Sequence, residues 1–567
     1  MIARFADSFQ DLSNGTITFE HLWTIFEPGT LLYARIDNQN RALHLQSSNY
    51  ATVNKQEVFV LTCSYVDFDG HRFAAVKLSP FVKDFTGTTQ IVRLPAFPLE
   101  LHGDRQNIRA QLIERGHRFE SLAGVHFCHY DGVAFCYDRN GSKEHFVVNG
   151  RVVIDKLGDN QMNPNQAEYF FPSKDFDPAD FTQNSRKPMH ADDEDDASGM
   201  AIHGVGCGIP EHGRTPSGDD QKRPKLTENQ KIICGPFVCG YALNEKKWLN
   251  LCINSLSDIS FDELAFSDLR LPEQRKDLLV GLASPQQSYW NDSKDLIERK
   301  GRGVLIHLCG PHGVGKTLTA ESVAEKLKVP LFTLASGDGD LELYSPDIES
   351  RLQGLMSMCG RWGAIILLDE ADALLEETGR HNLDHKRLVS VFLRVTEHYK
   401  GIIFLTTNHV EKLNPAFESR IHISLEYPEL DRKCRRGIWQ TLLRRHNVTQ
   451  DAARKISAPT VAEVPKCATK RPLSPAPSAN PNGNQAAERL HQELTRPHQV
   501  SNGEIGKLAE LKLNGRQIKK FLRTAQLMAI YKEEALQYGH INTAVSVLQQ
   551  FHKAKEAQDE VYRRAYC

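Results

Sequence analysis

The sequence predicts an α/β domain built on a parallel sheet with a C-terminal helical lid, preceded by a β-rich N-terminal domain. After Gly303, short apolar runs alternate with segments of helical spacing, which is typical of a parallel sheet covered by helices on both faces. Helical spacing continues over 504–548. Before residue 183, apolar runs instead alternate with turn residues.

The N-terminal part, 1–183, contains four apolar runs, at 57–70, 71–78, 124–137 and 145–155. Asp69-Gly70 and Asn149-Gly150 are dipeptides typical of hairpins. The histidines and acids of this part are spread out, so the sequence favours a structural or partner-binding domain here over a catalytic one.

Two segments have compositions that cannot bury enough apolar area to offset the ordering of the chain. The first, 184–228, holds the acidic run 192–196, and the second, 457–484, is rich in Pro, Ala and Ser. We expect both to be disordered, one as a linker and one as an insertion in the lid. Their basic clusters, 222–225 and 470–471, are explained by solvated linker charge, with nuclear import as the alternative. A connecting segment, 229–300, joins the first linker to the α/β domain.

The α/β core is expected over 301–430 and the lid over 431–567. Buried strands are expected at 304–309, 330–334, 364–368, 401–407 and 421–425, with helices between them. In the lid, apolar residues from Leu508 to Leu527 should form the core, and Asn514-Gly515 separates two helices. Ligands of such sheets bind beyond the carboxyl ends of the strands.

Composition excludes some classes of protein. A chain of 567 residues is too long for one hydrophobic core, so several domains are expected. Its 69 Lys+Arg are balanced by 71 Asp+Glu, so the net charge gives no support for nucleic-acid binding. The twelve cysteines include no C-x-x-C pair, which favours reduced thiols. The sequence has neither a signal-like start nor eighteen consecutive apolar residues. We therefore expect an intracellular protein, cytoplasmic or nuclear, without a membrane span.

A phosphate-binding pattern, G-x-x-x-x-G-K-[ST], follows the first strand of the core directly. Its glycines allow backbone N–H groups to surround phosphate, and the next helix adds its positive end. Lys316 would reach the outer phosphates and Thr317 would hold Mg²⁺. The sequence therefore predicts a P-loop NTPase sheet that binds ATP and Mg²⁺ through Gly310, Pro311, His312, Gly313, Val314, Gly315, Lys316, Thr317 and Leu318.

Further polar residues follow the later strands of the core. Strand 364–368 runs into Asp369-Glu370, where the first acid can hold Mg²⁺ and the second can activate water. Asn408 ends another strand and would lie beside the γ-phosphate. Arg420, just before the last strand, is a candidate arginine finger, although a lone arginine there is more commonly a surface ion-pair residue.

These stretches resemble the AAA ATPases, and most closely a fungal group of AAA proteins whose β-rich N-terminal domain has no assigned function. The resemblance covers about 261–548 and, more loosely, the front half of the chain. It implies that 310–317 is Walker A, that Asp369 and Glu370 form Walker B, and that Asn408 is sensor 1. It also implies that Arg420 acts on a neighbouring subunit, that Arg516 is the sensor 2 residue of the lid, and that the chain forms a ring hexamer.

The sequence departs from the family pattern at several positions near subunit contacts. His312 stands where a proline is usual, His385-Lys386 replaces Arg-Asn, His409 replaces an arginine and Asn414 an aspartate. The pore loop is also not evident, since its region offers only Tyr344. ATP binding should survive these changes, whereas efficient hydrolysis and ring assembly are open questions.

The leading hypothesis is a protein that hydrolyses ATP to remodel a macromolecular client, which the N-terminal domain would select. The alternative is a nucleotide-gated scaffold that binds ATP with little or no hydrolysis. A small-molecule kinase would need an acceptor site, and the sequence shows no recognisable one. The residue pattern does not identify the client.

Overall fold

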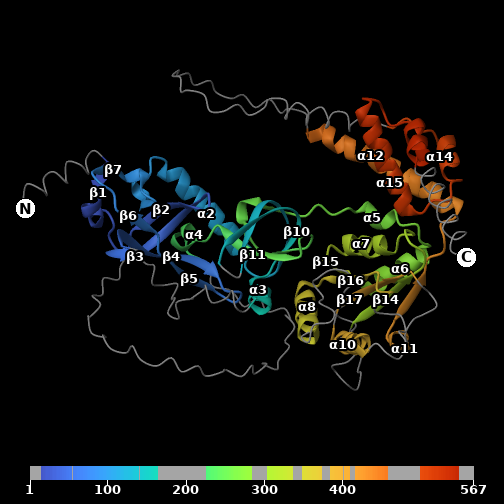
Figure 1. The fold of residues 1–567 in the computed structure, drawn as a ribbon, viewed down its shortest axis with the longest axis horizontal. Coiled ribbons are helices and arrows are strands. Elements are labelled where there is room, and N and C mark those ends of the chain that lie inside the picture. The colour runs from blue at the N-terminus through green and yellow to red at the C-terminus, as the bar shows by residue number, and fades with distance from the viewer. Residues whose placement is uncertain are drawn as a thin grey trace, which may run out of the picture. The chain divides into compact units, whose positions relative to one another are not determined.

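The computed structural model of the chain describes residues 15–53, 55–138, 141–163, 225–283, 303–335, 348–372, 383–399, 401–408, 415–456 and 498–547. Most of the expected linker 184–228, the insertion 457–484, Tyr344, His409 and Asn414 lie outside these residues, as do the side chains of His385 and Lys386. The chain divides into two units, Met1–Ser260 and Phe261–Cys567. Each unit has its own sheets and cores (Figure 1).

The first unit begins with an antiparallel sheet of order β5-β4-β3-β2-β8, with β6 paired to β4. Its strands are β2 (Leu31–Ile36), β3 (Gln39–Val53), β4 (Gln56–Phe68), β5 (Phe73–Leu78), β6 (Phe81–Lys83) and β8 (Ala96–Pro98). Asp37 and Asn38, both at positive φ, make the two-residue turn between β2 and β3. β1 (Thr16–Thr18) pairs with β7 (Thr88–Gln90) beside it.

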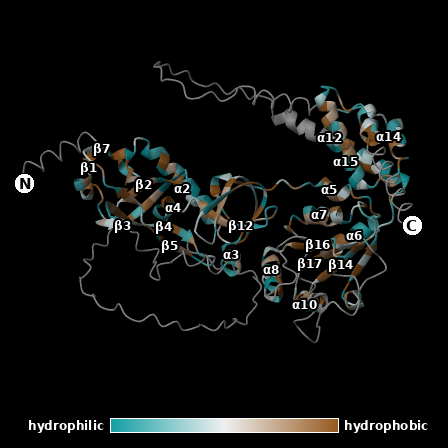
Figure 2. Cartoon of the chain, in the orientation of Figure 1, coloured by the Kyte–Doolittle hydropathy of each residue, from teal (hydrophilic) through white to brown (hydrophobic). Residues whose placement is uncertain are grey.

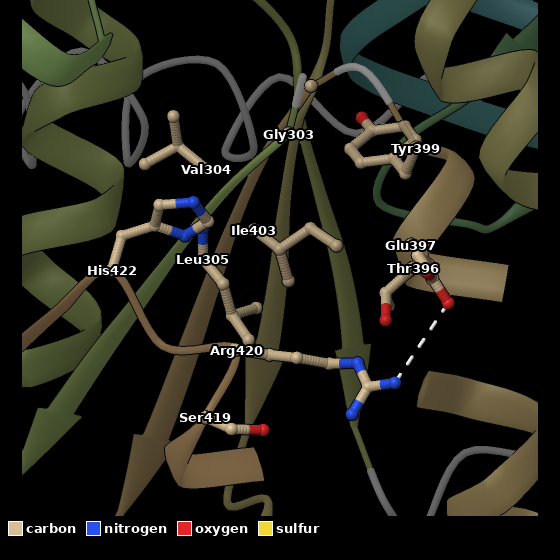
Figure 3. A pocket seen from close by; sticks show the side chains of 11 residues that line it. Gly303, Val304, Leu305, Thr396, Glu397, Tyr399, Ile403, Ser419, Arg420 and His422 are labelled. Carbon is tan, nitrogen blue, oxygen red and sulfur yellow. Dashed lines mark hydrogen bonds and ion pairs between the residues drawn. The ribbon is translucent and has the colours of Figure 1, made fainter. Parts of the chain in front are cut away.

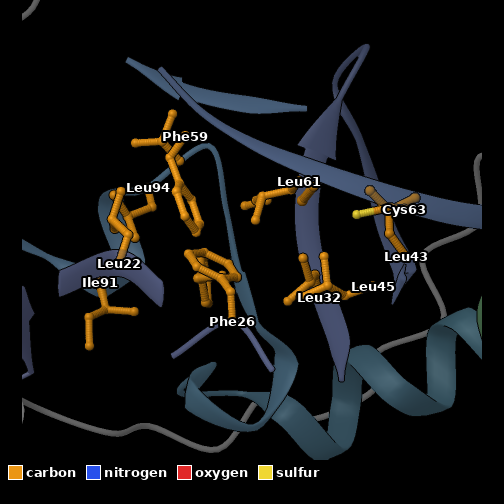
Figure 4. Packing of buried hydrophobic residues seen from close by; sticks show 14 of the residues in the cluster. Leu22, Phe26, Leu32, Leu43, Leu45, Phe59, Leu61, Cys63, Ile91 and Leu94 are labelled. Atoms are coloured by element: carbon orange, nitrogen blue, oxygen red, sulfur yellow. The ribbon is translucent and has the colours of Figure 1, made fainter. Parts of the chain in front are cut away.

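One face of this sheet is covered by a short 3₁₀ helix, η1 (Phe19–Thr24). Phe26 and Phe59 meet with their ring centroids 5.6 Å apart, and Leu22 and Leu61 pack around them (Figure 4). The inward residues of β4 alternate with more exposed ones, because successive side chains of a strand point to opposite faces.

A second sheet in this unit closes on itself. Its strands are β9 (His126–Tyr137), β10 (Lys143–Ile154), β11 (Phe237–Ala242), β12 (Lys247–Cys252) and β13 (Leu256–Ser257). β9 pairs with both β10 and β12, and β11 also pairs with both, which makes a small antiparallel barrel. Residues 237–252, expected in a connecting segment, therefore complete the barrel of the N-terminal unit. Their short apolar runs did not reveal a pairing with strands about 100 residues earlier.

The remaining elements of the first unit are helical. They are η2 (Ile91–Arg93), η3 (Leu99–Leu101), α2 (Arg105–Ser121), α3 (Lys156–Met162), α4 (Glu228–Ile232) and η6 (Ile253–Ser255). α2 and α4 pack so closely that a Cβ on Gly116 would lie 2.3 Å from the carbonyl oxygen of Lys231. Residues far apart in the sequence thus share one core.

The buried carboxyl of Asp67 in β4 should make the stability of the chain depend on pH. Burial raises the pKa of Asp67 to about 6, although its Oδ1 accepts a hydrogen bond from the Phe68 N–H at 2.7 Å. A carboxyl whose pKa is raised by folding costs stability above that pKa, and the cost disappears as the pH falls toward the unfolded value. Asp67→Asn should therefore stabilise the chain by up to about 3 kcal/mol at pH 7 and by only about 0.5 kcal/mol near pH 4. Thermal unfolding of the full chain and the variant at both pH values measures this, and equal shifts at both would contradict it.

The second unit is built on a parallel sheet of order β15-β16-β17-β14-β18. Its strands are β14 (Val304–Cys309), β15 (Leu331–Ala335), β16 (Ile365–Asp369), β17 (Ile402–Thr407) and β18 (Ile423–Glu426). All six residues of β14 are buried, as expected for a central parallel strand, and Figure 2 shows the apolar character of these strands. The expected parallel α/β sheet is confirmed.

Helices flank this sheet on both sides (Figure 1). They are α5 (Leu264–Ser267), α6 (Glu273–Ala283), α7 (Lys316–Leu327), α8 (Ile348–Trp362), α10 (Leu383–His398) and α11 (Pro415–Glu418). None of the helices within the described residues combines the length and the apolar character needed to cross a bilayer.

The lid contains α12 (Arg432–Ile456), α14 (Asn502–Leu508), α15 (Gly515–Tyr531) and a helical stretch at 538–547. Trp439 is fully buried at its centre, and Ile518 and Phe521 of α15 pack in the same cluster. Leu527 was expected in this core, but it is 61% exposed. It follows Ile518 by two and a half helical turns and so lies on the opposite face of α15.

Candidate functional site

The loop between β14 and α7 has a backbone that requires glycine. Gly310, Gly313 and Gly315 have φ values of 137°, 73° and 110°, which residues with a Cβ rarely adopt. A Cβ on Gly310 would also lie 2.2 Å from the carbonyl oxygen of Tyr427. Pro311 and His312 are exposed, and Val314 is half-buried. This loop presents its backbone at the start of a helix, which is the arrangement that binds phosphate.

The Lys316 ammonium lies across this loop. Its Nζ donates hydrogen bonds to the carbonyl oxygens of Gly310 at 2.6 Å and Pro311 at 2.9 Å, and to Oδ1 of Asn408 at 2.9 Å. Burial lowers the pKa of Lys316, while Asp372 and Asp369 oppose that shift. The first helical residue and the end of β17 therefore meet at one point.

Thr317 and Asp369 lie in direct contact. The Thr317 hydroxyl donates to Oδ1 of Asp369 at 2.9 Å, and Asp369 is the last residue of β16. Hydroxyl and carboxylate oxygens are ligands that Mg²⁺ prefers, so this pair fits the ion. Glu370 follows, exposed and with φ at 54°, a left-handed conformation that is uncommon for residues other than glycine. Lys316, Thr317, Asp369 and Asn408 are thus brought together beyond the carboxyl ends of three neighbouring strands.

Asp372 is a residue that the sequence analysis missed. Its carboxylate accepts two hydrogen bonds from Asn408, one from the backbone N–H at 2.8 Å and one from Nδ2 at 2.9 Å. With Nδ2 held in this way, Oδ1 of Asn408 faces Lys316. The only signal in the sequence was an acid two positions beyond Glu370, and nothing there paired it with Asn408.

His307 and Tyr427 are two further contacts that the sequence did not indicate. His307 lies between the hydroxyls of Ser424 (Nδ1, 2.9 Å) and Thr407 (Nε2, 3.2 Å), and it connects β14 to its two neighbouring strands. Burial lowers the pKa of His307, so the ring is neutral near pH 7. The Tyr427 hydroxyl lies 2.7 Å from that of Thr319 in α7. Both contacts secure the sheet beneath the loop.

Arg420 lies away from this cluster. Its Nη1 donates to the carbonyl oxygen of Ala416 at 3.1 Å, and its Nη2 is 3.9 Å from the carboxylate of Glu397. It lines a cavity with Val304 and His422 at the amino ends of β14 and β17 (Figure 3). The phosphate loop starts at the other end of β14, about 17 Å away at the usual rise of a strand. The structure does not bring Arg420 to the phosphate loop of its own chain.

The lid contacts the phosphate loop where α15 begins. The Gly515 N–H donates to the carbonyl oxygen of Gly313 at 2.7 Å, and a Cβ on Gly313 would lie 2.8 Å from the side chain of Asn514. Arg516 comes next and is exposed. Leu318, one residue beyond Thr317, is 54% exposed. The start of the lid helix thus lies against the loop, with Arg516 beside it.

Two family profiles match the chain. Residues 306–429 match the ATPase family associated with various cellular activities (AAA), and residues 8–103 match a domain of unknown function, DUF7025. The chain therefore has a DUF7025 domain followed, later in the sequence, by an AAA domain.

Curated relatives match part of the chain. An ATP-dependent zinc metalloprotease FtsH 2 of Sorangium cellulosum is 32% identical over 22% of this chain and 23% of its own length. Fidgetin-like protein 1 of Drosophila melanogaster is 28% identical over 31% and 32%, respectively. A putative ribosome biogenesis ATPase nvl of Dictyostelium discoideum is 37% identical over 19% of this chain and 12% of its own length. The matched stretches thus span less than a third of these relatives.

Solved structures also match. The crystal structure of the FIGL-1 AAA domain aligns with a TM-score of 0.34 and 16% identity, over 51% of this chain and 85% of that one. The crystal structure of the same domain in complex with ADP aligns with a TM-score of 0.34 and 17% identity, over 53% of this chain and 92% of that one.

Proposed function

We propose that this chain binds Mg²⁺-ATP between the phosphate loop and the lid and hydrolyses it as an AAA ATPase. The observation that carries the proposal is the meeting of Lys316, Thr317, Asp369 and Asn408 behind a loop whose glycines fit a phosphate cradle. The AAA match over 306–429 and the two relatives named for ATP dependence or ATPase activity support it. That the chain is most similar to a fungal group of AAA proteins is part of this proposal.

The residues have separate roles in this reaction. Lys316 would neutralise charge on the outer phosphates, and Thr317 with Asp369 would hold Mg²⁺, which supplies further charge neutralisation when bound. Glu370 would take the proton of the attacking water, and Asn408 would orient that water. Arg516 would contact the phosphates from the lid. The backbone of 310–315 and Leu318 would complete the nucleotide contacts.

Phosphate release by the purified full chain, with ATP and Mg²⁺, tests the proposal. We expect release that depends on both and that Lys316→Ala abolishes. Tight ATP binding by the parent chain without release would instead favour the nucleotide-gated scaffold.

We further propose that the chain works as a homo-oligomer, by resemblance a ring hexamer, on a protein client inside the cell. The distance between Arg420 and its own phosphate loop supports the oligomer, because the arginine could then act on a neighbouring subunit. The N-terminal unit, which has three sheets and, among its described residues, no cluster of side chains that could hold a metal ion, is the part we assign to client binding. The location is proposed as cytoplasmic or nuclear.

Proximity labelling in cells with a Glu370→Gln chain tests the client proposal. An ATP-locked chain should retain its client, so specific proteins should be enriched over a Lys316→Ala control. Equal labelling by the two variants would count against remodelling.

Asp372→Asn tests whether the hydrogen bonds to Asn408 matter for hydrolysis. The variant keeps the size of the side chain but offers only one good acceptor to the two N–H donors of Asn408. We expect a fall in kcat of roughly tenfold with little change in KM, because a displaced Asn408 would no longer orient the water. Steady-state kinetics measure this. A raised KM with unchanged kcat would show a role in binding instead.

A further inference from the structure

We infer that Thr406 is a positioning residue that sets the geometry of both acids at the end of β16. The inference rests on the proposed ATP hydrolysis, and it assigns a role to a residue outside the motifs. Thr406 lies near the end of β17, next to β16 in the sheet, and only 1% of its surface is exposed.

The Thr406 hydroxyl contacts both acidic residues. It donates its one proton to Oδ1 of Asp369 at 2.6 Å, and its oxygen accepts the backbone N–H of Glu370 at 3.0 Å. A hydroxyl has one donor, so its donor is committed to Asp369. The carbonyl oxygen of Thr406 also accepts the Ala371 N–H at 2.9 Å. One residue thus holds three consecutive positions of the neighbouring chain segment.

The backbone held in this way is an unusual one. Glu370 has φ at 54°, a conformation that residues with a Cβ adopt at a cost and that persists where the surroundings determine it. The N–H that Thr406 binds belongs to this residue. The Thr406 hydroxyl therefore helps to hold the backbone from which the Glu370 side chain projects.

The same hydroxyl also holds the side chain of Asp369. Its Oδ1 accepts from Thr317 of α7 at 2.9 Å as well as from Thr406. The carboxylate is therefore held by side chains of both the P-loop helix and β17. Partners of metal-binding groups that orient them in this way typically contribute 10–100-fold in metal affinity or activity.

Thr407 provides a matched comparison. It is the next residue of β17, 2% exposed, and its side chain points to the opposite face of the sheet, where its hydroxyl lies 3.2 Å from Nε2 of His307. Thr406→Val and Thr407→Val each remove one buried hydroxyl at constant shape. Only the first removes hydrogen bonds to the two acids.

The test compares Thr406→Val, Thr406→Ser, Thr407→Val and the parent in the full chain. Two quantities are measured for each: kcat for phosphate release, and the Mg²⁺ concentration that half-saturates binding of a fluorescent ATP analogue. For Thr406→Val we expect kcat to fall and the Mg²⁺ requirement to rise, each by about 10–100-fold. Thr406→Ser should restore both to within about threefold of the parent, since it keeps the hydroxyl, and Thr407→Val should change neither beyond that.

Three results would overturn the inference: parent-like values for Thr406→Val, no rescue by Thr406→Ser, or an equal loss in Thr407→Val. The second measurement separates this inference from the proposed function. If the parent chain releases no phosphate, the ATPase proposal fails, and the Mg²⁺ dependence of binding in the same variants still decides the role of Thr406.

Discussion

Glu370→Gln should bind ATP as the parent chain does and release phosphate about 10²–10⁴-fold more slowly, because it removes the proposed general base. The substitution preserves the volume of the side chain and the backbone hydrogen bond from N–H to Thr406. The hydrogen bonds of Lys316 and Thr317 described above go to other residues. Binding and chemistry should therefore separate in this variant.

The measurement is phosphate release at saturating ATP, together with the affinity for the fluorescent ATP analogue. Glu418→Gln is a suitable control, since it makes the same chemical change at an exposed acid of the same domain. Parent-like release in Glu370→Gln would remove Glu370 from the mechanism. Loss of ATP binding would show that the residue shapes the nucleotide site instead.

Arg420→Ala should reduce phosphate release strongly, and mixing this variant with Lys316→Ala chains in one oligomer should restore release. Arginine fingers contribute about 10³–10⁵ in turnover in the GTPases where they have been measured, which sets the scale of the loss. Arg420 lies at the amino ends of β14 and β17, whereas Gly310 follows the carboxyl end of β14. If the guanidinium acts on a phosphate as proposed, that phosphate is one bound by another subunit.

Mixed oligomers test that requirement directly. Co-expressed Arg420→Ala and Lys316→Ala chains, each inactive alone, should recover activity, because the first keeps an intact phosphate loop and the second an intact arginine. Arg394→Ala is the matched control, since Arg394 is an exposed arginine of α10 that pairs with Glu349. Absence of recovery in verified mixed oligomers would place the action of Arg420 within its own chain, or outside catalysis.

Sequence patterns were sufficient for the parts of the fold with strong local signals. The run 304–309 is apolar except for His307, and a buried parallel strand was expected and found there. The glycines at 310, 313 and 315 were expected to let backbone N–H groups surround phosphate, and all three have positive φ. These features depend on short stretches of chain, which is why they could be read from the residues alone.

Other features depend on contacts between distant segments. The strands at 237–252 were assigned to a connecting segment, because their pairing with β9 and β10 spans about 100 residues that carry no sign of it. Leu527 matched the helical spacing of its neighbours but lies on the outer face of α15. The roles of Asp372 and Thr406 could not be predicted either, because they depend on hydrogen bonds to residues of another segment of the chain.

By itself, the sequence determined that this chain has a phosphate loop, an acidic strand end and a parallel α/β sheet, because each follows from residue types at fixed local spacing. Only the tertiary structure decided that Asp369 is held by Thr317 and Thr406, that Asp372 holds Asn408, and that Arg420 lies far from its own phosphate loop. The physical reason is the order of the strands. β14 lies between β17 and β18, so residues about 100 positions apart become neighbours, while both ends of β14 remain separated by its full length.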